Sequence, residues 1–309
     1  MLTRLSPRQR RALALDTIVP LCSDENADVR QGVLEALGEV IYTFHEDETG
    51  PPDEILRLFL GRAEDRRALD KQRSANAEIA VKWGILSTSP TFAFQTSEIN
   101  QKTPEEPPLE LFYKDSGRPL ICAFNLPAVA VTLGRKRWPE LRDLYLYLTK
   151  DPSLKVRRTL AASLGELAKI IGPDNAQRDL LPVWKTSIKF EEDTEVRIKA
   201  LECTEVFIGA LDEGRCRKEV AEEMVDVWRA GTLRGWRERQ TAASSLAGIH
   251  ASIGEKEPII IRNLLMLALE DPVAAVRETG KSSVSSLNPN HDSTLTAFAA
   301  TTSLEEFQP

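Results

Sequence analysis

Few residues of this chain have the type and spacing that catalysis requires. The sequence has three histidines, and they lie far apart in it, at His45, His250 and His291. His45 is followed by Glu46, but such a pair contributes to an iron site only where several pairs come together. The sequence contains no G-x-x-x-x-G-K-[ST], G-x-G-x-x-G or G-x-S-x-G motif. We therefore predict no catalytic, cofactor-binding or metal-binding residue, and no enzyme activity.

The cysteines do not suggest a metal site either. Cys22, Cys122, Cys203 and Cys216 show no two-residue spacing. The first three lie in apolar stretches, where cysteine acts as a small hydrophobic residue. We expect neither disulfides nor zinc.

Composition and charge narrow the class of partner. The formal net charge is −7 and the basic residues are interspersed, a pattern that disfavours nucleic-acid binding. No apolar run approaches the roughly 20 residues that span a bilayer. The arginine-rich N-terminus lacks the apolar core of a secretory signal. We expect a cytoplasmic or nuclear protein, or one present in both compartments, that binds neither nucleic acid nor membrane and has other proteins as partners.

Aspartates and arginines, by contrast, recur with a regular spacing. Three pairs lie six positions apart: Asp24 and Arg30, Asp151 and Arg157, and Asp271 and Arg277. The apolar pattern of residues 29–40 returns in residues 156–167. The positions equivalent to Val29 are Arg118, Val156, Val196, Glu238 and Val276. From Arg118 onward they follow one another at about 40-residue steps, a period typical of stacked helix pairs.

The Asp and Arg pattern has two interpretations. In the structural one, the aspartate caps the second helix of its repeat and the arginine reaches the turn of the neighbouring repeat. This interpretation covers Asp24, Arg30, Asp151, Arg157, Arg197, Asp271 and Arg277. The alternative is direct contact between these arginines and a partner.

These recurrences predict an all-α fold, an α-solenoid with an irregular insertion. Residues 6–48 form one repeat and residues 118–287 a stack of four, while 288–309 are a disordered tail. Residues 49–117 lose the period and form a largely irregular or disordered insertion, apart from a short amphipathic helix at 53–60. Pro127 should kink or divide its helix. Asp151-Pro152 and Asp271-Pro272 should begin helices, as N-cap and first residue.

The turns within the repeats are the candidate binding surface, because the same edge of every repeat aligns into one ridge. The acidic turn at 191–195 neighbours the basic segment at 155–158, so opposite charges could select a partner. The alternative is that these are solvated helix ends. Trp236 is either a binding hot spot or packed on the repeat beneath. The candidate residues are Lys155, Arg158, Glu191, Glu192, Asp193, Glu195, Arg234 and Trp236.

The repeats resemble HEAT repeats, in which Pro, Asp and Val-Arg occupy these positions. Residues 118–285 more specifically resemble the C-terminal half of the serine/threonine-protein phosphatase 4 regulatory subunit 1 family. The resemblance rests on residues 122–135, Trp138, residues 155–160 and 166–168, residues 179–183 and 195–198, and Trp236, Arg237 and Arg239. In that family a variable insertion separates two repeat blocks.

The resemblance implies a HEAT-repeat scaffold, a non-catalytic regulatory subunit without a cofactor. Such a subunit holds a serine/threonine phosphatase catalytic subunit and presents phosphoprotein substrates to it. The alternative is a HEAT-repeat adaptor for transport or for the assembly of a complex.

Overall fold

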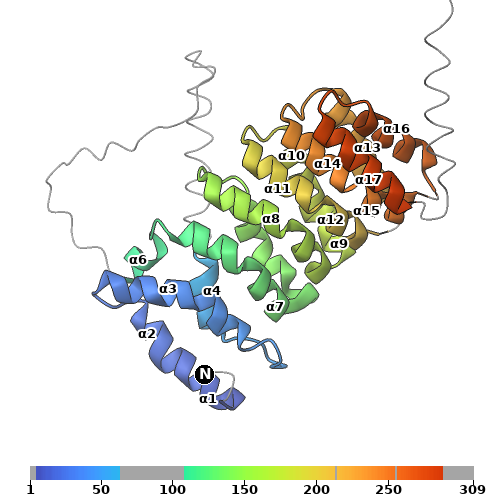
Figure 1. Cartoon of the computed structure of the whole chain (residues 1–309). Coiled ribbons are helices and arrows are strands. Elements are labelled where there is room, and N and C mark those ends of the chain that lie inside the picture. The colour runs from blue at the N-terminus through green and yellow to red at the C-terminus, as the bar shows by residue number, and fades with distance from the viewer. Residues whose placement is uncertain (1–4, 63–107, 213, 255, 288–309) are drawn as a thin grey trace, which may run out of the picture. The chain divides into compact units, whose positions relative to one another are not determined.

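The computed structural model of the chain describes residues 5–62, 108–212, 214–254 and 256–287. Every regular element within these ranges is a helix (Figure 1), which confirms the predicted all-α solenoid class. The chain divides into two compact units. Unit 1 comprises Met1–Leu133 and Asp143–Tyr147, and unit 2 comprises Gly134–Arg142 and Leu148–Pro309. The predicted tail at 288–309 and most of the predicted insertion lie outside the described residues.

Unit 1 begins with a helix pair. A continuous helical segment consists of α1 (Pro7–Leu13), a π turn η2 (Ala14–Ile18) and α2 (Val19–Leu21), and α3 (Ala27–Tyr42) follows it. Ser6 and Gln9 form a capping box at the start of α1. The π turn directly precedes the segment that contains Pro20, whose ring and missing N–H disturb a regular α-helical ladder.

The other helices of unit 1 lie before and after residues 63–107 in the sequence. Helix α4 (Asp53–Leu60) buries Ile55, Leu56, Leu58 and Phe59, and α6 (Pro108–Tyr113) precedes α7 (Arg118–Leu148). Arg118 of α7 donates from Nη2 to the carbonyl of Phe59 at 2.8 Å and also to that of Leu58. Helix α4 thus contacts the start of α7, and the predicted boundary between residues 117 and 118 does not coincide with the division into units.

The interruption of α7 lies at a glycine and not at a proline. Gly134 has φ 69° and ψ 176°, the one non-helical residue within α7, and glycine adopts a positive φ without steric cost. Pro127 retains helical dihedral angles. Of the two effects predicted for Pro127, a kink or a division of its helix, division was therefore wrong, since the absence of its N–H removes one hydrogen bond without ending the helix.

Unit 2 is a two-layer stack of helices. The first layer contains α8 (Leu154–Ile171), α11 (Thr194–Glu202) with α12 (Thr204–Ala210), α14 (Trp236–Ser244) with α15 (Leu246–Ile253), and α17 (Ala274–Leu287). The second contains the continuous segment of α9 (Pro173–Asn175), η3 (Ala176–Leu180) and α10 (Leu181–Lys189), then α13 (Arg215–Arg229) and α16 (Pro258–Leu269). Figure 1 shows these helices following one another from green to red.

The turns that precede α8 and α17 differ from the prediction. The carboxylates of Asp151 and Asp271 accept from the backbone N–H two residues later, at 2.8 Å in both cases. The helices then begin at Leu154 and Ala274, so that Pro152 and Pro272 belong to the turns. The expected aspartate caps were wrong, because each carboxylate closes an Asx turn before the helix starts. Asp24 does the same towards Asn26, and Asn26 is the N-cap of α3.

Two glycines of α3 allow a matched test of this packing. A Cβ on Gly38 would collide with the side chain of Asn125, whereas a Cβ on Gly32 would have no neighbour within 4 Å. We expect Gly32→Ala to stabilise the protein by about 0.5–1 kcal/mol, because alanine is the better helix former. Gly38→Ala should instead destabilise it by about 1–3 kcal/mol through overpacking. Urea denaturation followed by circular dichroism measures both, and equal shifts in the two variants would contradict the packing of α3 against α7.

Candidate protein-binding surface

Arginines link successive repeats of unit 2. Arg157 donates from Nε and Nη2 to the carboxylate of Glu191, at 3.0 and 3.1 Å. Arg197 donates to Glu238 at 2.5 Å. Arg239 donates to both oxygens of Asp271, at 2.5 and 3.3 Å. We call these three ion pairs the arginine ladder; each connects the second helix of one repeat to the following repeat.

Two of these arginines also close their own turns. Arg157 donates from Nη1 to the carbonyls of Asp151 and Pro152, at 2.8 and 3.1 Å. Arg239 does so to Leu233 and Arg234, at 3.1 and 3.0 Å. Each guanidinium thus satisfies carbonyls that precede a helix while it holds the next repeat. The Asp and Arg pattern did not predict the ion pairs of Arg239 and Glu238, since no aspartate precedes Arg239 by six positions.

At the two ends of the described repeats the arginine serves its own turn alone. Arg30 donates to the carbonyls of Asp24 and Glu25, at 2.7 and 2.9 Å, and Arg277 donates to that of Asp271 at 2.6 Å. Among the described residues neither arginine reaches another repeat's turn. The predicted contact across repeats is therefore not made by Arg30 or Arg277.

The ladder uses part of the predicted binding ridge. Glu191 is the carboxylate that Arg157 contacts, and Asp193 caps α11 by accepting from the N–H of Glu195 at 2.8 Å. Arg158 lies 3.9 Å from Glu195. Because these opposite charges face one another, they offer a partner less charge than their sequence suggests.

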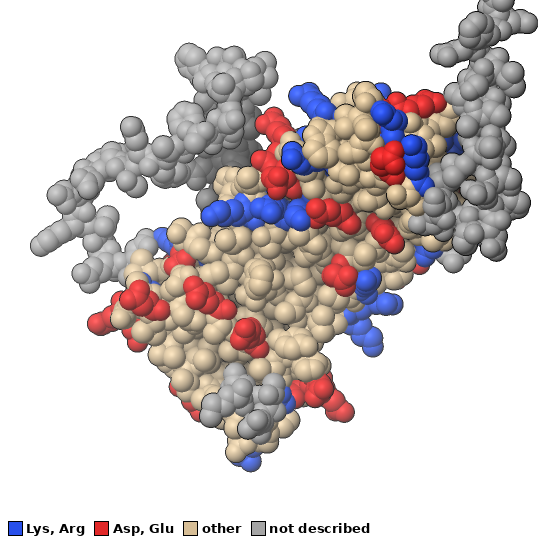
Figure 2. All heavy atoms as spheres, viewed as in Figure 1, with Lys and Arg blue, Asp and Glu red and all other residues tan. Residues whose placement is uncertain are grey.

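Several ridge residues remain open to solvent. The side chains of Lys155, Glu192 and Arg234 are exposed and form no ion pair within the described residues. Trp236 begins α14 and is 39% exposed, with the guanidinium of Arg237 over its ring at 4.7 Å. Figure 2 shows Lys and Arg atoms gathered over α8 with Asp and Glu atoms next to them. The ridge therefore combines an accessible aromatic ring with a few unpaired charges, which suits protein recognition.

A buried carboxylate links two helical segments of unit 2. The side chain of Asp179, in the π turn η3, is fully buried. It accepts from Trp138 Nε1 at 2.8 Å, from Arg142 Nε at 2.8 Å and from Arg178 Nη2 at 2.7 Å. Burial acts to raise the pKa of the Asp179 carboxyl, but these hydrogen bonds outweigh it and hold that pKa below its ordinary value. This role was not predicted from the sequence, because Asp179 lies outside the Asp and Arg pattern.

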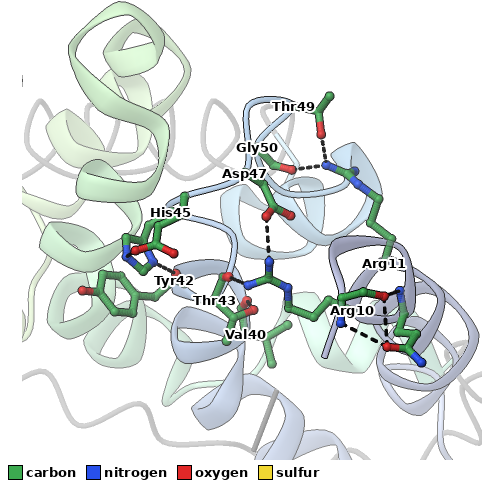
Figure 3. Close-up of polar contacts among 12 residues, drawn as sticks. Arg10, Arg11, Val40, Tyr42, Thr43, His45, Asp47, Thr49 and Gly50 are labelled. Carbon is green, nitrogen blue, oxygen red and sulfur yellow. Dashed lines mark hydrogen bonds and ion pairs between the residues drawn. The ribbon is translucent and has the colours of Figure 1, made fainter. Parts of the chain in front are cut away.

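His45 has a structural environment and not that of a metal ligand. Figure 3 shows it in the loop after α3, where its ring stacks on Tyr42 and Nδ1 lies 2.9 Å from the Tyr42 carbonyl. Arg10 of α1 holds the same loop through Asp47 at 2.7 Å and through the carbonyl of Thr43. Within the described part of the chain, no three His, Cys, Asp or Glu side chains are grouped to hold a metal ion.

No described helix is long and apolar enough to cross a membrane.

The thiols provide a further test of burial. Cys22, Cys122 and Cys203 are buried, whereas Cys216 is partly exposed. Burial raises the pKa of Cys203 to about 12 and that of Cys22 to about 11. We expect iodoacetamide at pH 8 to modify Cys216 slowly and the other three only after unfolding, because the thiolate is the reactive form. Mass spectrometry of the native protein checks this, and rapid labelling of Cys203 would contradict its burial beside α8.

Comparison with known proteins connects this surface to one family. Residues 122–227 match the family described as protein phosphatase 4 regulatory subunit 1 middle domain. The human, mouse and rat proteins named serine/threonine-protein phosphatase 4 regulatory subunit 1 are each 38% identical to this chain over 125 residues. That alignment covers 40% of this chain and 13% of each relative. The matched residues include Asp179 and two arginines of the arginine ladder, Arg157 and Arg197. Over this part of its length, the chain therefore resembles the middle domain of serine/threonine-protein phosphatase 4 regulatory subunit 1.

Proposed function

We propose that this chain is a non-catalytic regulatory or scaffold subunit that binds a serine/threonine phosphatase catalytic subunit of the protein phosphatase 4 type. In this role it helps to direct the dephosphorylation of phosphoprotein substrates, in the cytoplasm, the nucleus or both. The observation that carries the proposal is the match of residues 122–227 to the middle domain of such a subunit. Hydrolysis and its metal ions belong to the partner, and this chain contributes a rigid surface.

The turn ridge of unit 2 is the surface we propose for the catalytic subunit. The arginine ladder fixes the spacing of successive turns, so that their exposed side chains keep a constant arrangement. Trp236 and Phe190, which is 71% exposed, supply apolar contact area at two of these turns. Exposed aromatic rings on a rigid support bind at low entropic cost, because few rotamers are lost.

Affinity capture of the catalytic subunit by the full chain tests this proposal. We expect the wild type to retain the purified phosphatase 4 catalytic subunit, and Trp236→Ala combined with Glu192→Lys to weaken its binding at least tenfold. Glu191 and Asp193 are unsuitable for the test, because the ladder and the α11 cap use them. Ile259→Ala is the matched control, since Ile259 is 73% exposed at the start of α16 and lies outside these turns.

The outcomes separate the two candidate roles. Wild-type binding that survives the double substitution would place the contact elsewhere on the chain. A wild-type chain that retains no catalytic subunit would contradict the regulatory role and favour the adaptor role.

A further inference from the structure

Helix α7 presents an apolar face that its own core does not use. Leu120, Phe124 and Val131 recur along one side of the segment before Gly134, and all three are exposed. Phe124 is 75% exposed, the largest exposed fraction among the large apolar residues that the structure describes. The opposite side of the same segment is buried, with Leu126 and Val129 fully inaccessible. The exposed side is therefore a second apolar face, and such faces mark contact sites.

Helix α3 lies beside this face and runs parallel to it. A side chain on Gly38 would meet Asn125, and a Cβ on Gly117 would lie 3.8 Å from Gln31 Nε2. The two contacts advance in the same direction along both helices, which fixes their orientation and register. In the repeat alignment, where Val29 is equivalent to Arg118, Glu35 is equivalent to Phe124 and Glu39 to Ala128.

The face of α3 is acidic where that of α7 is apolar. Glu35 and Glu39 are exposed, and neither carboxylate forms an ion pair with any described residue. Glu35 accepts a hydrogen bond from Gln31 Nε2 at 2.8 Å, which leaves its charge uncompensated. Figure 2 shows Asp and Glu atoms over α3. We call Leu120, Phe124 and Val131 together with Glu35 and Glu39 the acid–apolar face.

We propose that the acid–apolar face binds an amphipathic helix of a partner protein, with apolar side chains against Phe124 and lysines or arginines against Glu35 and Glu39. Parallel apolar and acidic stripes match a helix whose apolar face has a basic edge. An anionic membrane fits poorly, because it would repel the two carboxylates. The argument uses unit 1 alone and does not depend on the proposed phosphatase role.

A pair of synthetic peptides tests this with the full chain. The first is a fluorescein-labelled helical peptide of about four turns, with leucine and phenylalanine at i, i+3, i+4 and i+7 and lysines along one edge. The second has glutamate in place of each lysine. We expect fluorescence anisotropy to show binding of the lysine peptide and at least tenfold weaker binding of the glutamate peptide.

Substitutions in the protein locate the site. Phe124→Ala should weaken binding of the lysine peptide at least tenfold, whereas Ile259→Ala, which shortens a similarly exposed apolar side chain in unit 2, should leave it unchanged. Glu35→Lys with Glu39→Lys should reverse the preference between the two peptides. Both sets change exposed side chains, so unaltered circular dichroism and urea midpoints confirm that the fold is intact.

Four results would overturn the proposal. They are no binding of the lysine peptide to the wild type at about 1 mM, unchanged binding by Phe124→Ala, a wild-type dimer in sedimentation that Phe124→Ala converts to monomer, and Phe124-dependent binding to phosphatidylserine vesicles. The third result would assign the face to a second copy of this chain, and the fourth would assign it to a membrane.

Discussion

Replacing Asp179 with alanine should destabilise unit 2 by about 3 kcal/mol, because it removes the acceptor of three donors at once. The loss at Trp138 is the decisive one. Its indole is buried and donates to Asp179 at 2.8 Å, so without the carboxylate its N–H stays buried with one bond fewer. Arg142 and Arg178 are 40% and 54% exposed, and water can replace their bonds.

The measurement is urea unfolding of wild type and variant, followed by tryptophan fluorescence and circular dichroism. Asp174→Ala is the control; Asp174 lies in the same helical segment but is exposed, so its loss should change the free energy of unfolding by less than about 1 kcal/mol. Equal effects of the two substitutions would show that the buried hydrogen bonds of Asp179 contribute no stability.

The pH dependence of stability follows from the same carboxyl. Its pKa is lower in the folded protein than in the unfolded chain, so the unfolded chain binds the proton more tightly. The stabilisation is fully present above the unfolded value of about 4 and is lost as the pH falls through the folded value. The difference in stability between wild type and Asp179→Ala should therefore be constant near neutral pH and shrink below about pH 4.

The repeat architecture was accessible from the sequence because its signals are local. Apolar residues at helical spacing, and the return of residues 29–40 at 156–167, depend on neighbours within one helix or on a fixed period. They predicted the all-α class, which the structure confirms, together with the helix at 53–60. They did not predict which helix α4 packs against. Its partner is α7, whose Arg118 donates to the carbonyl of Phe59, and residues 63–107 separate the two helices in the sequence.

The errors at helix starts have one physical cause. Asp followed by Pro satisfies the rules for both an N-cap and an Asx turn, and local sequence does not distinguish them. At Asp151, the guanidinium of Arg157 donates to the carbonyls of Asp151 and Pro152. These bonds stabilise the Asx turn and not an earlier start of the helix. That contact depends on the side chain of Arg157 folding back along its own helix, which no pattern in the turn reveals.

The sequence predicted where the candidate site lies, but it did not predict what each of its residues does. The turns were singled out, yet Glu191 and Asp193 serve the fold and leave the surface to residues such as Glu192 and Trp236. Asp179 was missed because a buried carboxylate resembles a surface one in sequence. Its burial depends on Trp138, which lies in another helix.

The irregular step of the arginine ladder leads to a second large effect. The turn position that carries an acid at Glu191 and Asp271 is Leu233 in the intervening repeat. Glu238 supplies the carboxylate instead, from the position where the neighbouring repeats have Val196 and Val276. The resulting pair is more buried than the others, with Arg197 9% and Glu238 1% exposed.

Glu238→Val should therefore cost about 3–4 kcal/mol, because it leaves the guanidinium of Arg197 buried without its carboxylate. It also removes the bond that Glu238 accepts from the N–H of Gly235 at 2.6 Å. Adding Arg197→Met should recover at least half of the loss, since an apolar pair at this position needs no compensating charge. Glu191→Gln at the more exposed step, where Arg157 is 23% exposed, should cost only about 1 kcal/mol.

Urea unfolding of wild type, Glu238→Val, Arg197→Met and the double substitution gives the coupling free energy between Arg197 and Glu238, and Glu191→Gln is measured beside them. If the double substitution is no more stable than Glu238→Val, the buried guanidinium does not cause the loss of stability. The lost hydrogen bond from the N–H of Gly235 to Glu238 then accounts for it. If Glu191→Gln costs as much as Glu238→Val, burial does not set the strength of the ladder. The expected order follows from desolvation, because the step that is most shielded from water is the one that tolerates an unpaired charge least.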